Sequence, residues 1–162
     1  MDSKIQQHIH KTEIIECFSR YAVAIDNGDS NAFAELFSKD CLWKWETENF
    51  KLHLKGKKAL KELADVVSKT CPGAQHLISN HIVTVAEEKA HCVCALMVFL
   101  SRPEGIYATM QGFYNADLVQ EGGRWLISEL RVQVLNPEIC QQGKIGEYWA
   151  GISDYLQKKL ES

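Results

Sequence analysis

Four long segments of alternating side chains fill the second half of the chain, and they constrain the fold more than any other feature. They span about Gln75–Ala86, Lys89–Ser101, Gly105–Gln120 and Arg124–Asn136, and short polar turns separate them. A period of two is typical of β-strands, and turns of two or three residues join antiparallel neighbours. We therefore predict an antiparallel meander, which must bury a face against the rest of the chain.

The first half of the chain carries helical patterns and two short strands. Apolar residues recur at helical spacing over residues 4–27, and Gly28 is a natural stop before a second, short helix. Trp43 and Trp45 lie on one face of a short strand, and another short strand follows it. A third helix is predicted over residues 57–69.

Length and composition are those of one globular domain. The chain has 162 residues, of which 46% are hydrophobic and 24% are charged. Helices that precede a strand meander predict a single α+β domain over residues 1–162. The net charge is −3 and no block of lysine or arginine stands out, so we expect no nucleic-acid partner.

The N-terminal residues and the cysteines bear on the cellular compartment. Residues 1–8 lack the apolar segment of a secretory signal, and no apolar run is long enough to cross a bilayer. We expect a cytoplasmic protein with no membrane partner. The cysteines lack the spacing of a zinc site and are expected to be reduced, buried thiols: Cys17, Cys41, Cys71, Cys92, Cys94 and Cys140.

The strand predicted over residues 90–100 is apolar on both of its faces. One face must meet the helices or a pocket, and the other face must be covered as well. Few helices remain to cover it, so a subunit interface is the simplest explanation. We expect a homodimer or a homotrimer.

Asp26 and His76 are the leading candidates for a functional site. Asp26 lies in the last turn of the first helix, where the helix dipole disfavours a carboxylate. His76 begins a strand and shares a predicted face with Ile78 and Asn80, the composition of a pocket wall with a few polar groups. Asp26 could instead be a solvated helix end, and His76 a core histidine. Together they would form a dyad whose carboxylate fixes the tautomer of the imidazole.

Other side chains are candidates for the same pocket. Tyr21 lies inside the apolar stripe of the first helix, so its hydroxyl needs a partner or a cavity. Arg131 on the last strand could hold an anionic or carbonyl group, or pair with Glu129. His81 is predicted to point away from His76, to the surface or an interface. Candidates for the apolar wall are Trp43, Trp45, Met97, Phe99 and Tyr114.

Several common catalytic motifs do not occur in the sequence. It contains no nucleophile elbow, no phosphate-binding glycine loop, no HExxH and no dinucleotide fingerprint. We therefore expect no metal and no cofactor. The functions that remain open are acid–base catalysis without a cofactor and simple ligand binding.

Six segments resemble, in chain order, SnoaL-like proteins of the nuclear transport factor 2-like superfamily. They are residues 20–29, 36–41, 55–60, 76–80 (His-Leu-Ile-Ser-Asn), 112–114 (Gly-Phe-Tyr) and 125–127 (Trp-Leu-Ile). The resemblance implies a cone-shaped barrel, in which N-terminal helices pack on a strongly curved, mostly antiparallel sheet around a pocket. Family members include polyketide cyclases, scytalone dehydratase, bile-acid dehydratase and meroterpenoid isomerases. Many of them need no cofactor, and several form dimers or trimers.

The resemblance also implies roles for individual residues. A helix aspartate and a strand histidine form the proton-abstracting dyad of the dehydratase branches, and these positions match Asp26 and His76. The tyrosine that the bile-acid branch uses matches Tyr21, and an arginine on the final strand matches Arg131. Arg131 and Asn80 would orient the substrate.

One position departs from the family pattern. Family strands often read G-x-Y-x-D, but this chain has Ala116 at the aspartate position and Asp117 one residue later. Asp117 is therefore assigned no role in the pocket. The leading interpretation is a lyase or isomerase, of dehydratase or cyclase type, acting on a hydrophobic polyketide-, terpenoid- or steroid-like molecule. The alternative is a non-catalytic binding or assembly module on the same fold.

Overall fold

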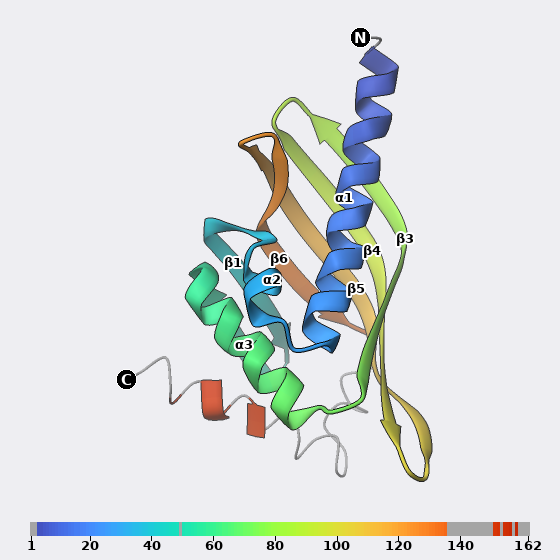
Figure 1. The fold of residues 1–162 in the computed structure, drawn as a ribbon, viewed down its shortest axis with the longest axis vertical. Helices are drawn as coiled ribbons and strands as arrows, with labels where there is room; N and C mark the ends of the chain where they lie inside the picture. The colour runs from blue at the N-terminus through green and yellow to red at the C-terminus, as the bar shows by residue number, and fades with distance from the viewer. Residues whose placement is uncertain (1–2, 49, 136–150, 153, 157, 159–162) are drawn as a thin grey trace.

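The computed structural model describes residues 3–48, 50–135, 151–152, 154–156 and 158. Within these residues the chain forms helices and strands in the order expected for an α+β protein (Figure 1). The helices are α1 (Ser3–Asp26), α2 (Ser30–Ala34) and α3 (Gly56–Thr70). The strands are β1 (Phe37–Thr47), β2 (Phe50–Lys55), β3 (Ala74–Ala86), β4 (Lys89–Arg102), β5 (Gly105–Glu121) and β6 (Arg124–Val134).

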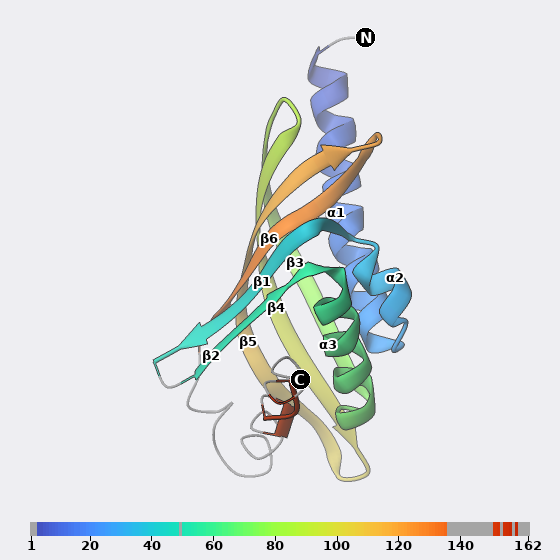
Figure 2. The ribbon, with the colours of Figure 1, turned by 90° about the vertical axis from the view of Figure 1, so that its left-hand side faces the viewer.

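The strands form one sheet in the order β2-β1-β6-β5-β4-β3. Neighbours are antiparallel except for β1 and β6, which run parallel. The sheet curves around the helices, which all lie on its concave side (Figures 1 and 2). The α+β class and the curved sheet are thus confirmed, but the barrel is not closed, because β2 and β3 are both edge strands in the described part of the chain.

The expected alternation fails in β3, where a bulge shifts the register between Ser79 and Ile82. Asn80 sits in this bulge with φ 54° and is exposed, so it does not share the inward face with His76. An extra residue in a strand sends the following side chains to the opposite face. His81 therefore points inward, with its ring 5.9 Å from that of Phe18, and the prediction that it lies at the surface is wrong.

Aromatic side chains fill the core between α1, α2 and the sheet. The ring of Tyr21 lies 4.7 Å from that of Phe33 and 5.3 Å from that of Tyr114. The described cysteines are free and buried as predicted, while Cys140 lies outside the described residues. In the described part of the chain, no helix has the length and apolar character needed to cross a membrane.

Part of the described C-terminal residues packs against the rest of the fold. Ile152 and Leu156 are both buried there, whereas Tyr155 is about half exposed. Ile152 reaches the concave side of the sheet and contributes to the cavity described below.

Candidate active site

Asp26 and His76 meet where the end of α1 lies against the start of β3. Oδ1 of Asp26 is 2.6 Å from Nδ1 of His76, and Oδ2 accepts a hydrogen bond from the backbone N–H of His76 at 2.9 Å. The side chains of His76 and Asp26 are only 8% and 18% exposed. An ionised carboxylate can only accept, so this contact holds the proton of a neutral imidazole on Nδ1 and leaves Nε2 free to take up a proton.

The turn after α1 places Asp26 beside β3. Gly28 has φ +69°, and a Cβ at this position would lie 2.9 Å from Cβ of Ser68 on α3, so the turn requires glycine. Asp29 then caps α2 by accepting a backbone hydrogen bond at 2.9 Å. The carboxylate of Asp26, which the C-terminal end of a helix disfavours, is stabilised instead by the two N–H groups of His76.

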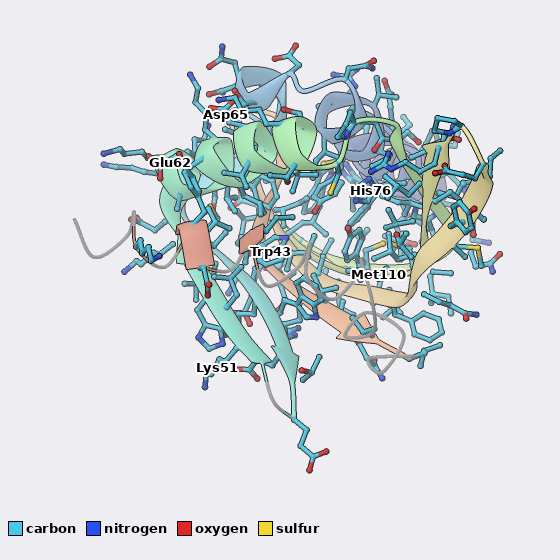
Figure 3. All side chains as sticks on the ribbon, turned by 90° about the horizontal axis from the view of Figure 1, so that it is seen from below. Trp43, Lys51, Glu62, Asp65, His76 and Met110 are labelled. Atoms are coloured by element: carbon cyan, nitrogen blue, oxygen red, sulfur yellow. The ribbon has the colours of Figure 1, made fainter. Side chains whose placement is uncertain are left out.

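His76 lines a cavity between α1, α3 and the concave face of the sheet. Trp43, His76 and Met110 come from different strands and gather around this space, whereas Lys51 lies far outside it (Figure 3). Among the described residues that line the cavity, none is an aspartate, glutamate, lysine or arginine. The volume is about 30 Å³, which has room for roughly one or two water molecules.

Tyr21, Trp43, Trp45 and Tyr114 also line the cavity. Nε1 of Trp43 donates a long hydrogen bond of 3.4 Å to the hydroxyl of Tyr21. Burial raises the pKa of Tyr21 to about 12, and it raises the pKa of Tyr114 well above its ordinary value. Both hydroxyls therefore keep their protons at neutral pH.

Arg131 does not point into the cavity. Its neighbours Leu130 and Val132 take the inward face of β6, so Arg131 lies on the opposite face of the sheet. Nη1 of Arg131 is 2.5 Å from Oε1 of Glu129, and Nη2 is 3.1 Å from Oδ2 of Asp117. The expected ligand contact is therefore wrong, and pairing with Glu129, the other interpretation of the sequence, is what the structure shows.

Met97 and Phe99 also lie on the outer face, by which we mean the face of the sheet that points away from α1 and α3. Val98 pairs with His76 on one side and with Met110 on the other, so these three residues share the inward face. The neighbours of Val98 in β4 therefore point outward, and neither of them lines the cavity.

Sequence reasoning missed several inward residues, among them Met110, Val132 and Ile152. The pairing register of the strands, rather than the residue type, is what would have identified the strand residues among them. Met110 pairs with Val98 of β4, and Val98 in turn pairs with His76 of β3, but alternation alone does not tell which pairs face inward. Ile152 reaches the cavity only through tertiary packing.

The outer face carries a row of charges with alternating sign. Lys44 lies 2.8 Å from Glu129, and His91 lies 2.7 Å from Asp117, with Arg131 between the two carboxylates. Burial raises the pKa of Asp117, but hydrogen bonds from His91 and Arg131 outweigh it and hold the pKa below its ordinary value. Asp117 thus lies outside the cavity, as its position in the sequence indicated. In the described part of the chain, no group of three or more metal-ligating side chains is placed to hold an ion.

His81 should make the stability of the fold depend on pH. Burial lowers the pKa of its imidazole below 6.5, and Nε2 has no hydrogen-bond partner among the described residues. As the pH falls through 6.5, the unfolded chain binds the proton first. The stabilising contribution of the neutral ring is therefore present above that pH and is lost below it.

We expect the variant His81→Leu to lose less stability on acidification than the wild type. The melting temperature of the variant, measured by circular dichroism, should gain a few degrees relative to the wild type between about pH 8 and about pH 5. His8→Leu, on the exposed surface of α1, is the control. Its melting temperature should differ from that of the wild type by the same amount at both pH values. If the melting temperatures of His81→Leu and the wild type differ by the same amount at both pH values, the His81 ring has the same pKa in the folded and the unfolded chain.

Comparison with known proteins identifies the family. The model of the SnoaL-like domain matches residues 7–131. A variant of Rv3472, a protein of unknown function from Mycobacterium tuberculosis, is 20% identical over 96% of this chain and 95% of its own, with a TM-score of 0.85. No curated protein sequence matches the chain.

Two structures from Novosphingobium aromaticivorans are also similar. An NTF2-like protein with a cystatin-like fold is 21% identical over 83% of this chain and 87% of its own, with a TM-score of 0.76. A candidate scytalone dehydratase is 19% identical over 81% of this chain and 87% of its own, with a TM-score of 0.70. At these identities the likeness shows the fold, and the domain match shows the family. The chain belongs to the SnoaL-like domain family and has the nuclear transport factor 2-like fold.

Proposed function

We propose that this protein is a cofactor-free lyase or isomerase that moves a proton on a hydrophobic small molecule. The hydrogen bond of 2.6 Å between Asp26 and His76, at the wall of an apolar cavity, is the observation that carries the proposal. The family includes dehydratases and cyclases, and one structural neighbour is a candidate scytalone dehydratase, which supports this class of reaction. The substrate would be of polyketide, terpenoid or steroid type.

In the proposed reaction, Nε2 of His76 removes a proton from a carbon next to a carbonyl group. The carboxylate of Asp26 stabilises the imidazolium that forms. Tyr21 donates a hydrogen bond to the oxygen on which negative charge develops. Returning the proton to another carbon completes an isomerisation. In an elimination, the group on the neighbouring carbon leaves with its bonding electrons and takes the proton from the imidazolium, which restores neutral His76.

The cavity must open before such a substrate binds. Its volume of about 30 Å³ is far below the roughly 300–1,000 Å³ of a ligand pocket. Ile152 lines the cavity and is only 2% exposed, so this side chain covers part of the site. We propose that displacement of Ile152 gives the substrate its access.

Deuterium exchange tests the proposal without knowledge of the natural substrate. Acetophenone carries acidic protons next to its carbonyl group, and their replacement in D₂O is followed by ¹H NMR. We expect the protein to accelerate this exchange well above an equal concentration of free imidazole. A ketone that binds in the cavity but exchanges no faster than with imidazole would contradict the proposed reaction and favour a non-catalytic binding module.

We further propose that a second copy of this chain covers the outer face, as a homodimer. None of the described helices covers this face (Figure 2), although it carries the half-buried apolar residues Val93, Met97, Phe99 and Phe113. The row of alternating charges beside them lets a two-fold copy place each charge opposite one of the other sign.

The variant Met97→Glu should weaken this association. A carboxylate at the centre of an apolar interface is desolvated without a partner, so we expect monomers in sedimentation velocity at concentrations where the wild type is a dimer. Asn31→Glu adds the same charge on the exposed surface of α2 and should leave the dimer intact. A wild type that sediments as a monomer at every concentration would contradict the proposal.

A further inference from the structure

The C-terminal end of α3 supports both halves of the dyad formed by Asp26 and His76. Ser68, in the last turn of α3, lies against Gly28, two residues after Asp26, so closely that a Cβ on Gly28 would be 2.9 Å from that of Ser68. After a turn over residues 71–73, the chain enters β3 and reaches His76 (Figure 1). A displacement of this helix end would therefore move the carboxylate and the imidazole together.

The turn over residues 71–73 is held by the end of β4. Nη1 of Arg102 donates hydrogen bonds to the carbonyl oxygen of Pro72 at 2.6 Å and to that of Ser101 at 2.9 Å. The backbone N–H of Ser101 donates to the carbonyl oxygen of Gly73 at 3.0 Å. A Cβ on Gly73, which has φ +81°, would lie 3.1 Å from the carbonyl oxygen of Ser101, so the turn and the strand end are in close contact. The guanidinium thus fixes the point from which β3 starts.

The start of β3 needs this support because β3 is an edge strand, which pairs with β4 alone among the described strands. The backbone N–H of His76, the third residue of β3, donates to Oδ2 of Asp26 at 2.9 Å, and Oδ1 lies 2.6 Å from Nδ1 of the ring. Strand ends open more readily than strand centres. Both contacts with the carboxylate require the start of β3 to keep its position against α1, so a loose turn weakens them together.

We propose that Arg102 is a positioning residue for the dyad: it holds the turn between α3 and β3 and thereby keeps His76 at hydrogen-bond distance from Asp26. The inference rests on the proposed function for the reaction that the dyad performs. Arg102 is not among the described residues that line the cavity, so it acts on the reaction through geometry and not through contact with the substrate. A misplacement of a catalytic group by roughly 1 Å can cost about 10²-fold in rate.

Hydrogen exchange of the His76 amide tests this role without any substrate, by ¹H–¹⁵N NMR in D₂O. We expect Arg102→Gln to accelerate the exchange of this amide about tenfold, because its hydrogen bond to the carboxylate opens more often. The amide of Leu96, in the middle of β4, should exchange as in the wild type. Arg102→Lys keeps a charged donor and should restore part of the protection. Arg20→Gln, which removes an arginine from the exposed surface of α1, is the matched control.

Deuterium exchange into acetophenone separates positioning from a general loss of stability. Arg102→Gln should lower kcat about threefold to tenfold and change KM little. In an Asp26→Asn background the dyad is already broken, so a residue that acts through it has nothing left to position. The same substitution should then have no further effect on kcat. Equal slowing of the Asp26→Asn variant and of the wild type would overturn the inference.

The amide measurement can also contradict the inference. Equal acceleration of the His76 and Leu96 amides in Arg102→Gln would show a global loss of stability, and an unchanged His76 amide would show that the turn needs no guanidinium. If Arg102→Gln does not fold, Gly73→Ala takes its place, because its Cβ pushes the turn away from Ser101 and should accelerate the His76 amide in the same way. If the wild type exchanges no deuterium but Arg102→Gln accelerates the His76 amide alone, the positioning role stands and the proposed function fails.

Discussion

Replacing His76 with glutamine should slow the deuterium exchange of acetophenone by a factor of about 10²–10⁴. Glutamine keeps a similar size and polarity but has no nitrogen that takes up a proton near neutral pH. Asp26→Asn should slow the exchange as well, because an amide no longer holds the proton of the imidazole on Nδ1. Rates at saturating ketone are measured by ¹H NMR, together with the melting temperature of each variant.

The outer face provides a matched control for this experiment. His91 and Asp117 form a second imidazole–carboxylate pair at 2.7 Å, but their side chains are 45% and 46% exposed and lie on the opposite side of the sheet. His91→Gln should therefore leave the exchange rate unchanged. Full exchange by a folded His76→Gln variant would exclude this histidine as the base. An equal loss in His91→Gln would show that the effect comes from the fold rather than from the cavity.

Replacing Gly112 with alanine should destabilise the fold by about 3 kcal/mol, because the backbones of β5 and β6 approach closely at this point. A Cβ on residue 112 would lie 1.9 Å from the carbonyl oxygen of Gln133. The strands can relieve this contact only by separating. Two residues away on each strand, Tyr114 and Val132 line the cavity, so the separation should also widen the site.

Thermal unfolding followed by circular dichroism measures this effect. A loss of about 3 kcal/mol corresponds to a decrease of roughly 6–12 °C in the melting temperature of a domain of this size. Gly151→Ala, where an added Cβ meets no atom within 4 Å, is the control and should change the melting temperature little. A melting temperature of Gly112→Ala close to that of the wild type would mean that β5 and β6 move apart at little cost.

Repeating patterns in the sequence were sufficient to predict the helices and strands. The predicted helix over residues 57–69 is α3 (Gly56–Thr70), because apolar residues recur along one side of it and Gly56 and Cys71 bound it. Likewise the four long strands appear within a few residues of their predicted bounds. Such patterns are local, since each residue is read against neighbours two to four positions away.

The face of the sheet to which each side chain points was predicted less well than the location of the strands in the sequence. Alternation placed Asn80 beside His76 in the wall and sent His81 outward, yet one bulge reverses both assignments. The bulge inserts an unpaired residue, and no pattern of apolar and polar residues reveals it in advance. Met97 and Phe99 show the same limit, because a strand that is apolar on both faces does not say which face meets the helices.

The sequence by itself determined the elements of this protein and the identity of its two most unusual polar residues. Asp26 at a helix end and His76 at a strand start were both recognisable because each is costly there without a partner. Only the tertiary structure decided that they are partners, 50 positions apart, with a carboxylate that binds both N–H groups of one residue. Pairing at that separation depends on how α1 crosses the sheet, and the packing of the whole core sets this crossing rather than any local pattern.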